Sequence, residues 1–160
     1  MLTEAQELVD LARKAGAVIA TAESCTGGMI AAALTDIAGS SAVFDRGFVT
    51  YSNDAKTQML GVSADTLDAF GAVSPEVATE MAEGALTHSN ATMAVSVTGI
   101  AGPGGSAFKP EGRVVFGLAV KDGPTLTETH DFGALGRENV RRAATLHGVT
   151  MLLQALQIRR

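Results

Sequence analysis

Apolar and polar positions alternate with two different periods along the chain, and these periods predict helices and strands in turn. Apolar residues at helical spacing predict helices over residues 4–14, 27–37, 53–60, 64–70 and 136–158, and another that starts at Ser74-Pro75-Glu76. Asn53 is the expected cap of the helix at 53–60. Short apolar or β-branched runs predict strands at 17–21, 42–52, 91–98, 113–121 and 126–132. The turn sequence Asp122-Gly123-Pro124 joins the last two strands, so they are expected to form an antiparallel hairpin.

Alternation of helices and strands through most of the chain indicates the fold class. It favours a three-layer α/β/α sandwich around a mixed, mostly parallel sheet of about five or six strands. The chain has 160 residues and no internal repeat, linker or low-complexity segment. We therefore expect residues 1–160 to form a single domain.

Composition narrows the class of protein further. A hydrophobic fraction of 46% can supply a sizeable core, yet no uninterrupted apolar window of 18 residues exists, so no membrane-spanning helix is expected. The net charge of −5 argues against duplex nucleic acid as a partner. The single cysteine excludes an intramolecular disulfide, and the acidic N-terminus is unlike a secretory signal. Both observations favour a cytoplasmic location.

Three polar clusters each follow a predicted strand, at residues 23–26, 51–56 and 98–106. In open α/β sheets, ligands bind beyond the carboxyl ends of the strands, and parallel strands would bring the three clusters to one edge. The first cluster places the Ser24 hydroxyl, the Cys25 thiol and several backbone N–H groups at a strand-to-helix turn. Such a turn suits either an activated nucleophile or a bound anion.

The residues of these clusters also resemble a known family. Ala22-Glu23-Ser24-Cys25-Thr26-Gly27-Gly28, Tyr51-Ser52-Asn53 with Lys56, and Val97-Thr98-Gly99-Ile100-Ala101-Gly102-Pro103 are similar to the C-terminal domain family of the competence/damage-inducible protein CinA. The resemblance covers essentially the whole chain. Members include nicotinamide-nucleotide amidases, which hydrolyse nicotinamide mononucleotide to nicotinate mononucleotide and ammonia. Some members carry a further N-terminal domain, and the length of this chain suggests the stand-alone amidase form.

The resemblance implies roles for three catalytic residues. Ser24 matches the family's nucleophile and Lys56 its base, while Tyr51 could relay a proton or orient the lysine amine. A lysine accepts a proton only when its amine is neutral, a state that burial favours. The N–H groups of Cys25, Thr26 and Gly27 are expected to hold the oxyanion. Glu23 is expected to anchor the turn.

The glycine-rich loop after the third predicted strand is a candidate cradle for phosphate or ribose, because glycines let backbone N–H groups approach an anion closely. It lacks the GK[ST] ending of a Walker P-loop. Arg137, in a context that resembles the family's pattern, is the expected phosphate ligand. Arg46, Lys109, Arg141 and Arg142 are the other nearby cations, the last two expected in surface pairs or oligomer contacts. The substrate-binding residues expected in the loop are Thr98, Gly99, Gly102, Gly104, Gly105 and Ser106.

One segment departs from the family pattern. The family usually has Lys-Pro-Val-Gly where this chain has Lys109-Pro110-Glu111-Gly112. The change leaves the expected nucleophile and base untouched, but it affects the geometry of the substrate loop.

No cofactor or metal is expected. His88, His130 and His147 are widely spaced without a ligand pattern, and one cysteine argues against a structural zinc site. The expected partner is a small nucleotide substrate, and an Ala- and Met-rich helix face favours a homodimer.

Two other functions are open from the sequence. One is a non-catalytic nucleotide-sensing module, or a binding module related to competence or DNA damage, in which Ser24 only caps a helix. The other is a cysteine hydrolase that uses Cys25, since thiolates form readily at helix N-termini.

Overall fold

A mixed sheet of five strands forms the centre of the computed structural model, which describes residues 1–106 and 108–158. The strands are β1 (Ile19–Glu23), β2 (Phe44–Val49), β3 (Met93–Gly99), β4 (Arg113–Val120) and β5 (Leu126–Asp131). Their order is β2-β1-β3-β4-β5, with β1 parallel to β2 and β3, and β4 antiparallel to β3 and β5. Among these five, β4 alone runs against the rest, which confirms both the mostly parallel sheet and the hairpin.

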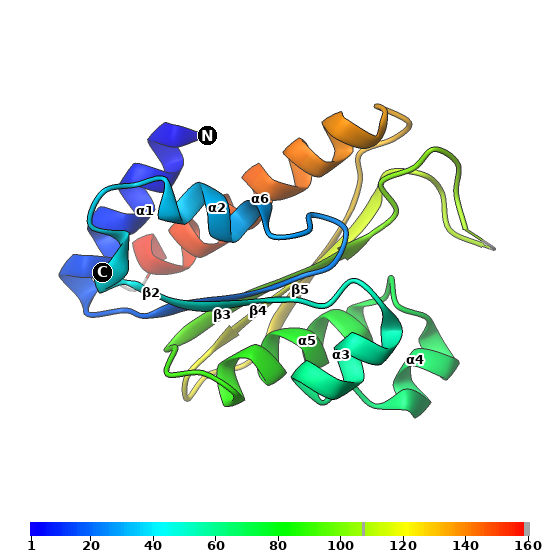
Figure 1. The fold of residues 1–160 in the computed structure, drawn as a ribbon, viewed down its shortest axis with the longest axis horizontal. Coiled ribbons are helices and arrows are strands. Elements are labelled where there is room, and N and C mark those ends of the chain that lie inside the picture. Colours follow the sequence, from blue (N-terminus) through cyan, green and yellow to red (C-terminus); the bar gives the residue numbers. More distant parts are fainter. Residues whose placement is uncertain (107, 159–160) are drawn as a thin grey trace.

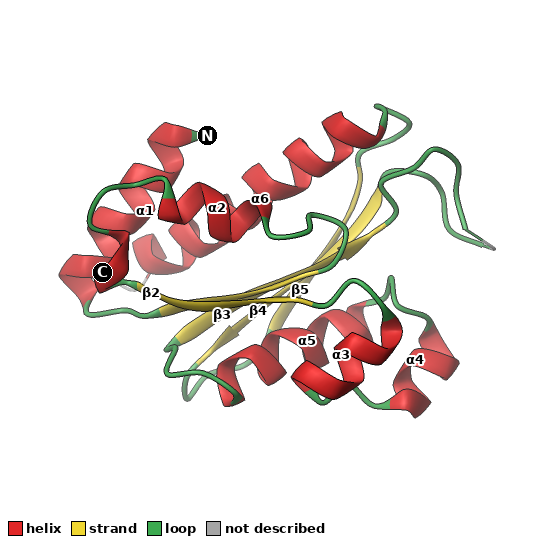
Figure 2. Ribbon diagram, viewed as in Figure 1, coloured by secondary structure: helices red, strands yellow, loops and turns green. Residues whose placement is uncertain are grey.

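Helices cover both faces of the sheet (Figures 1 and 2). One layer holds α1 (Leu2–Ala15), α2 (Met29–Thr35) and α6 (Arg137–Ile158); the other holds α3 (Asn53–Leu60), α4 (Ala64–Phe70) and α5 (Pro75–Thr87). Alternate residues of β1 feed the two cores: Ile19 packs with the first layer, and Ala20 and Ala22 with the second. This arrangement confirms the three-layer sandwich. A short 3-10 helix, Ser40–Ala42, precedes β2.

Several element boundaries differ from the sequence prediction, and two of these differences have a clear local cause. The second helix begins at Met29 rather than at residue 27, because Gly27 and Gly28 take positive φ angles of 60° and 106°. The cap of α3 is Ser52, whose hydroxyl accepts the N–H of Ala55 at 3.0 Å, rather than Asn53. By contrast, Ser74 caps α5 as predicted.

The carboxyl ends of β1, β2 and β3 meet at one edge of the sheet, since these three strands are parallel neighbours. The loops that follow them carry the three polar clusters. The loop that joins β3 to β4 extends away from the sheet at this end (Figure 1).

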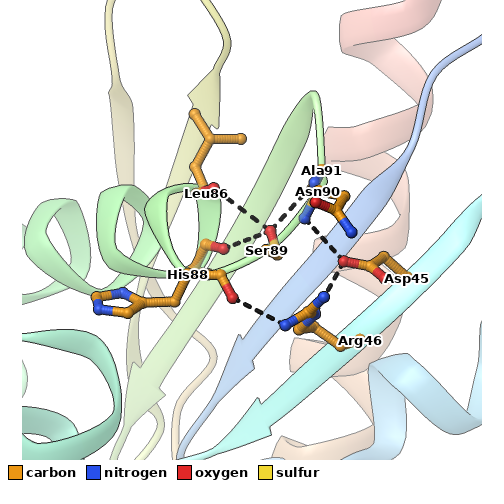
Figure 3. A network of polar contacts seen from close by, with 8 residues as sticks. Asp45, Arg46, Leu86, His88, Ser89, Asn90 and Ala91 are labelled. Carbon is orange, nitrogen blue, oxygen red and sulfur yellow. Dashed lines mark hydrogen bonds and ion pairs between the residues drawn. The ribbon is translucent and has the colours of Figure 1, made fainter.

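The amino ends of the strands are tied together at the opposite edge (Figure 3). Asp45 accepts hydrogen bonds from Arg46 Nε and from the Asn90 N–H, both at 2.9 Å, and Arg46 also donates to the His88 carbonyl at 3.1 Å. Ser89 completes the turn by donating to the Ala85 carbonyl at 2.6 Å. This network joins β2 to the turn between α5 and β3, and it places Arg46 away from the polar clusters.

A helix that crosses a membrane needs about 20 consecutive, mostly apolar residues. Within residues 1–106 and 108–158, none is both long and apolar enough to cross a membrane.

Close packing of α5 on α3 requires a glycine. A Cβ atom on Gly84 would lie 2.1 Å from the carbonyl oxygen of Leu60, the last residue of α3. A Cβ on Gly148 of α6 would instead meet the flexible end of the Ile30 side chain at 2.5 Å. The backbone contact cannot yield without moving a helix, whereas the Ile30 side chain can rotate.

We therefore predict that Gly84→Ala destabilises the protein by about 1–3 kcal/mol, because overpacking outweighs the gain in helix propensity. Gly148→Ala, the matched control, should cost less. Urea unfolding monitored by circular dichroism gives both values. Equal stability of the two variants would show that α3 and α5 are not in tight contact.

Candidate active site

Ser24 and Lys56 meet at the edge of the sheet where the polar clusters converge. Ser24 follows β1 directly, and its N–H donates to the Val97 carbonyl of β3 at 2.9 Å, which fixes the start of the turn. Lys56 lies on α3 and is only 1% exposed. Its Nζ donates to Ser24 Oγ at 3.0 Å. Ser24 and Lys56 are 32 positions apart in the sequence, yet their side chains are in contact at an ordinary hydrogen-bond distance.

The remaining partners of the Lys56 amine are neutral oxygens. Nζ donates to the main-chain carbonyls of Thr50 at 3.0 Å and Tyr51 at 3.4 Å. No ion pair to Lys56 occurs among the residues that the structure describes. Burial lowers the pKa of this amine below its ordinary value, because the charged form loses its hydration. The neutral amine that a general base needs is therefore favoured.

Glu23 anchors the turn between β1 and α2. Its buried carboxylate accepts the Thr26 hydroxyl at 2.6 Å and the N–H groups of Ile30 at 2.8 Å and Ala31 at 3.0 Å. These two N–H groups belong to the first turn of α2, which Glu23 therefore caps. The N-terminus of α2 is occupied by a side chain of the protein, in agreement with the anchoring role expected for Glu23.

The expected set of oxyanion donors needs one correction. The N–H of Gly27 already donates to the Ser24 carbonyl at 3.0 Å, so it closes the turn instead of facing a ligand. The N–H groups of Cys25 and Thr26 have no acceptor among the described residues. These two amides, next to Ser24, are the candidate donors in this turn.

Arg141 of α6 holds the outer side of the same turn. Its Nε donates to the Cys25 carbonyl at 3.0 Å and its Nη2 to the Thr26 carbonyl at 3.3 Å. In a trans peptide the C=O and N–H point in opposite directions, so a Cys25 carbonyl held by Arg141 turns the Thr26 N–H away from α6. No pattern in the chain indicates this contact, which joins residues 116 positions apart. Arg141 was expected only in surface pairs or oligomer contacts.

The thiol of Cys25 is poorly suited to be a nucleophile. The side chain is 5% exposed, and burial raises the pKa of the thiol to about 11. A thiol rather than a thiolate is therefore present at neutral pH. This argues against the cysteine-hydrolase alternative.

Tyr51 and Arg137 form a polar pair at the rim. Arg137 donates to the Tyr51 hydroxyl and to the Gly102 carbonyl, both at 2.8 Å. The contact of Tyr51 with Lys56 comes from its main-chain carbonyl, while its hydroxyl accepts from Arg137. A role for the phenol in moving or orienting the lysine proton stays a prediction.

A cavity of about 340 Å³ lies over these side chains. Its wall includes Asn53 of α3, which belongs to the second motif, and the loop residues Ala72 and Val73, which no sequence motif indicated. The complete lining is Ser24, Cys25, Tyr51, Asn53, Lys56, Ala72, Val73, Thr98, Gly99, Ile100, Ala101, Gly102, Pro103, Gly104 and Arg137.

The glycine-rich loop contributes only its first part to this cavity. Thr98 through Gly104 line it, but Gly105 and Ser106 do not, because the chain turns outward into a bridge between Ser106 and Lys109. A substrate contact through Gly105 or Ser106 stays a prediction from the sequence. The Thr98 hydroxyl donates to the Ala72 carbonyl at 2.9 Å, so it braces the wall instead of offering a free proton.

The other candidate cations have partners elsewhere. Lys109 donates to the carbonyls of Phe70, at 2.9 Å, and Val73, tying the outer loop to the connection between α4 and α5. Arg142 pairs with Glu138 on the surface of α6 at 2.7 Å. Among the five cations considered from the sequence, Arg137 alone lines the cavity.

The departure from the family pattern touches this loop directly. A Cβ on Gly102 would lie 1.9 Å from the Glu111 carboxylate, so Glu111 packs against the backbone that forms the cavity wall.

Comparisons with known proteins identify the family of this chain. The family model described as CinA C-terminal domain matches residues 2–156. The chain is 58% identical over 137 residues to a nicotinamide-nucleotide amidohydrolase PncC of Enterobacter agglomerans, covering 85% of this chain and 83% of that protein. It is 53% identical over 155 residues to the protein of that name from Escherichia coli K12, covering 96% and 93%.

Solved structures show the same fold. A competence/damage inducible protein CihA from Agrobacterium tumefaciens has a TM-score of 0.94 at 51% identity, covering 98% of this chain and 94% of that one. A competence damage-inducible protein A (ComA) from Klebsiella pneumoniae has a TM-score of 0.93 at 37% identity, covering 98% and 96%. A family match along nearly the whole chain, with relatives this similar over most of their own length, shows that the chain belongs to the CinA C-terminal domain family.

Proposed function

We propose that this chain is a nicotinamide-nucleotide amidohydrolase that converts nicotinamide mononucleotide to nicotinate mononucleotide and ammonia. The 3.0 Å contact between Lys56 Nζ and Ser24 Oγ carries the proposal, since it supplies a nucleophile and a base at the floor of the cavity. The names of the relatives from Enterobacter agglomerans and Escherichia coli support this choice of substrate.

The proposed reaction begins with proton transfer from Ser24 to the neutral Lys56 amine. Ser24 Oγ attacks the carboxamide carbon, and the N–H groups of Cys25 and Thr26 hold the oxyanion of the tetrahedral intermediate. One such donor is worth about 3–4 kcal/mol in known cases. The lysine ammonium then gives its proton to the leaving nitrogen, and ammonia departs from an acyl-serine ester.

Water completes the cycle. Lys56, again neutral, accepts a proton from the attacking water and returns one to Ser24 Oγ as the ester breaks. The three neutral oxygens around Nζ suit this role, because an amine that gains and loses a proton should not be fixed in one state by a carboxylate.

Arg137 and the loop around Gly102 form the proposed phosphate site. Both hydrogen-bond partners of Arg137 are uncharged, and no carboxylate pairs with it among the described residues. Its positive charge therefore stays available to a phosphate monoester. A homodimer and a cytoplasmic location stay predictions from the sequence.

Ser24→Ala should lower ammonia release from nicotinamide mononucleotide by at least about 10³-fold, because the acyl-enzyme cannot form. Ammonia is measured by a coupled assay, with circular dichroism to confirm folding. Ser41→Ala, an exposed serine before β2, is the matched control and should keep its activity.

Other outcomes identify the alternatives. Wild-type rates in folded Ser24→Ala would refute a serine nucleophile, and loss in Cys25→Ala instead would select the cysteine hydrolase. A thermal shift with nicotinamide mononucleotide but no ammonia in the wild type would select the nucleotide-sensing module.

The acid limb of the pH profile should report the Lys56 amine. Its pKa is lowered by burial, so kcat/KM should rise with pH and level off below the ordinary lysine pKa of 10.5. Lys56→Arg should be inactive at every pH, because a guanidinium does not give up its proton. Lys14→Arg on α1 serves as the control. A flat profile in the wild type, with unchanged melting temperature across the range, would exclude this base.

Arg137→Gln should raise KM for nicotinamide mononucleotide by about 10–100-fold, the value of a charge-assisted hydrogen bond of about 1.5–3 kcal/mol. Nicotinamide riboside, which lacks the phosphate, should be affected much less. Arg142→Gln removes a matched cation five residues along α6 and should leave KM unchanged. Equal losses on both substrates would contradict a phosphate role for Arg137.

A further inference from the structure

Two histidines and a glutamate converge on the sheet, away from the candidate active site. Glu128 and His130 are two residues apart on β5, so their side chains share one face of the strand. His147 comes from α6, which covers that face (Figure 1). Glu128 Oε2 lies 2.6 Å from His147 Nε2 and 3.3 Å from His130 Nε2. The wide spacing of the three histidines in the sequence does not indicate this grouping.

The three candidate ligand atoms are gathered closely enough for one small metal ion to reach them once the side chains adjust. Around tetrahedral Zn²⁺, with bonds of about 2.0–2.2 Å, neighbouring ligand atoms lie about 3.3 Å apart. The candidate ligand atoms of Glu128, His130 and His147 all lie within 4.8 Å of one another. The 2.6 Å contact between Glu128 and His147 must lengthen, and the wider separations must shorten, before all three atoms bind one ion.

Aromatic packing holds both imidazole rings in place. The buried ring of Phe116 meets His147 edge-on at a centroid distance of 4.6 Å and His130 at 5.8 Å. Phe132 stacks on the other side of His130 at 5.8 Å. The two imidazole rings also lie against each other, with centroids 4.0 Å apart, so packing restrains both rings and reduces the entropy lost on coordination.

The cluster is open to solvent on one side. The side chains of Glu128, His130 and His147 are 43%, 38% and 22% exposed. An ion can therefore enter, and water can occupy a fourth coordination position. None of the three residues lines the cavity over Ser24, so the cluster is separate from the proposed amidase chemistry.

We propose that Glu128, His130 and His147 form a binding site for a borderline transition-metal ion of the Zn²⁺ class. Imidazole nitrogens select such ions over Mg²⁺, which prefers oxygen ligands and octahedral geometry. A neutral histidine that binds through Nε2 carries its ring proton on Nδ1, and an imidazolium releases one proton to solvent. The carboxylate then exchanges its two imidazole hydrogen bonds for one metal bond.

Metal binding would fasten β5 to α6. β5 is an edge strand with mostly exposed residues, and α6 carries the two arginines of the candidate active site. An ion bound to both elements stabilises the folded state according to its free concentration.

Tag-free protein stripped with EDTA and titrated with ZnCl₂ tests the site. Isothermal titration should show one Zn²⁺ per chain, and the melting temperature should rise by roughly 5–10 °C at a free Zn²⁺ concentration about 100 times Kd. MgCl₂ should give no shift. Glu128→Gln, His130→Gln and His147→Gln should each bind Zn²⁺ at least about 10-fold more weakly. His88 is the one histidine outside the cluster, so His88→Gln is the matched control and should bind Zn²⁺ like the wild type.

Co²⁺ provides a test that needs no variant. Bound to the wild-type protein, it should give the visible d–d absorption of a four-coordinate nitrogen and oxygen site, and Zn²⁺ should displace it. The proposal is overturned if no saturable binding occurs, if the three variants bind like the wild type, or if His88→Gln abolishes binding. It is also overturned if the Co²⁺ spectrum is that of the hexaaquo ion.

Discussion

A lysine amine buried against a serine is the constraint on which the rest of this structure depends. An isolated ammonium is costly to bury, so the amine must find hydrogen-bond partners and give up part of its preference for the charged state. Carbonyls of Thr50 and Tyr51, just beyond β2, provide those partners without adding charge. Ser52 caps α3 immediately afterwards, which sets the direction in which Lys56 enters the site. The end of β2, the Ser52 cap and α3 together place the Lys56 amine beside Ser24.

The turn at Ser24 solves a second problem, that of keeping backbone donors free. A strand-to-helix connection ordinarily leaves the first N–H groups of the helix unpaired. Here Glu23 takes those of Ile30 and Ala31, while Gly27 closes the turn on Ser24. Among the described residues, the amides of Cys25, Thr26 and Gly28 have no backbone acceptor, and the first two follow the serine directly. The buried Glu23 carboxylate thus pairs the first N–H groups of α2, so these groups are not available to bind a ligand.

The sequence predicted the architecture well because its signals are local. Alternating periods, the Ser74-Pro75 helix start and the Asp122-Gly123-Pro124 turn all depend on neighbours in the chain, and the sheet and hairpin followed from them. The convergence of Ser24 and Lys56 was also within reach, because parallel strands share an edge. Donor use was not. Which N–H of the turn is free depends on the side-chain rotamer of Glu23, and Ser106 leaves the cavity because of a bridge to Lys109. The contacts of Arg141 and His147 span 116 and 19 residues, and no pattern in the chain points to either pairing.

α6 links these long-range contacts, which gives the last helix a role beyond closing the core. Arg137 and Arg141 are one turn apart, so one face of the helix carries both the rim cation and the clamp on the Ser24 turn. His147 lies on a different face, toward β5. Gly148 leaves room for the end of the Ile30 side chain of α2 against the same helix. A rotation or slide of α6 would therefore move both arginines at once. The proposed site at His147 is the point where an ion could restrain such a motion while touching none of the residues that line the cavity.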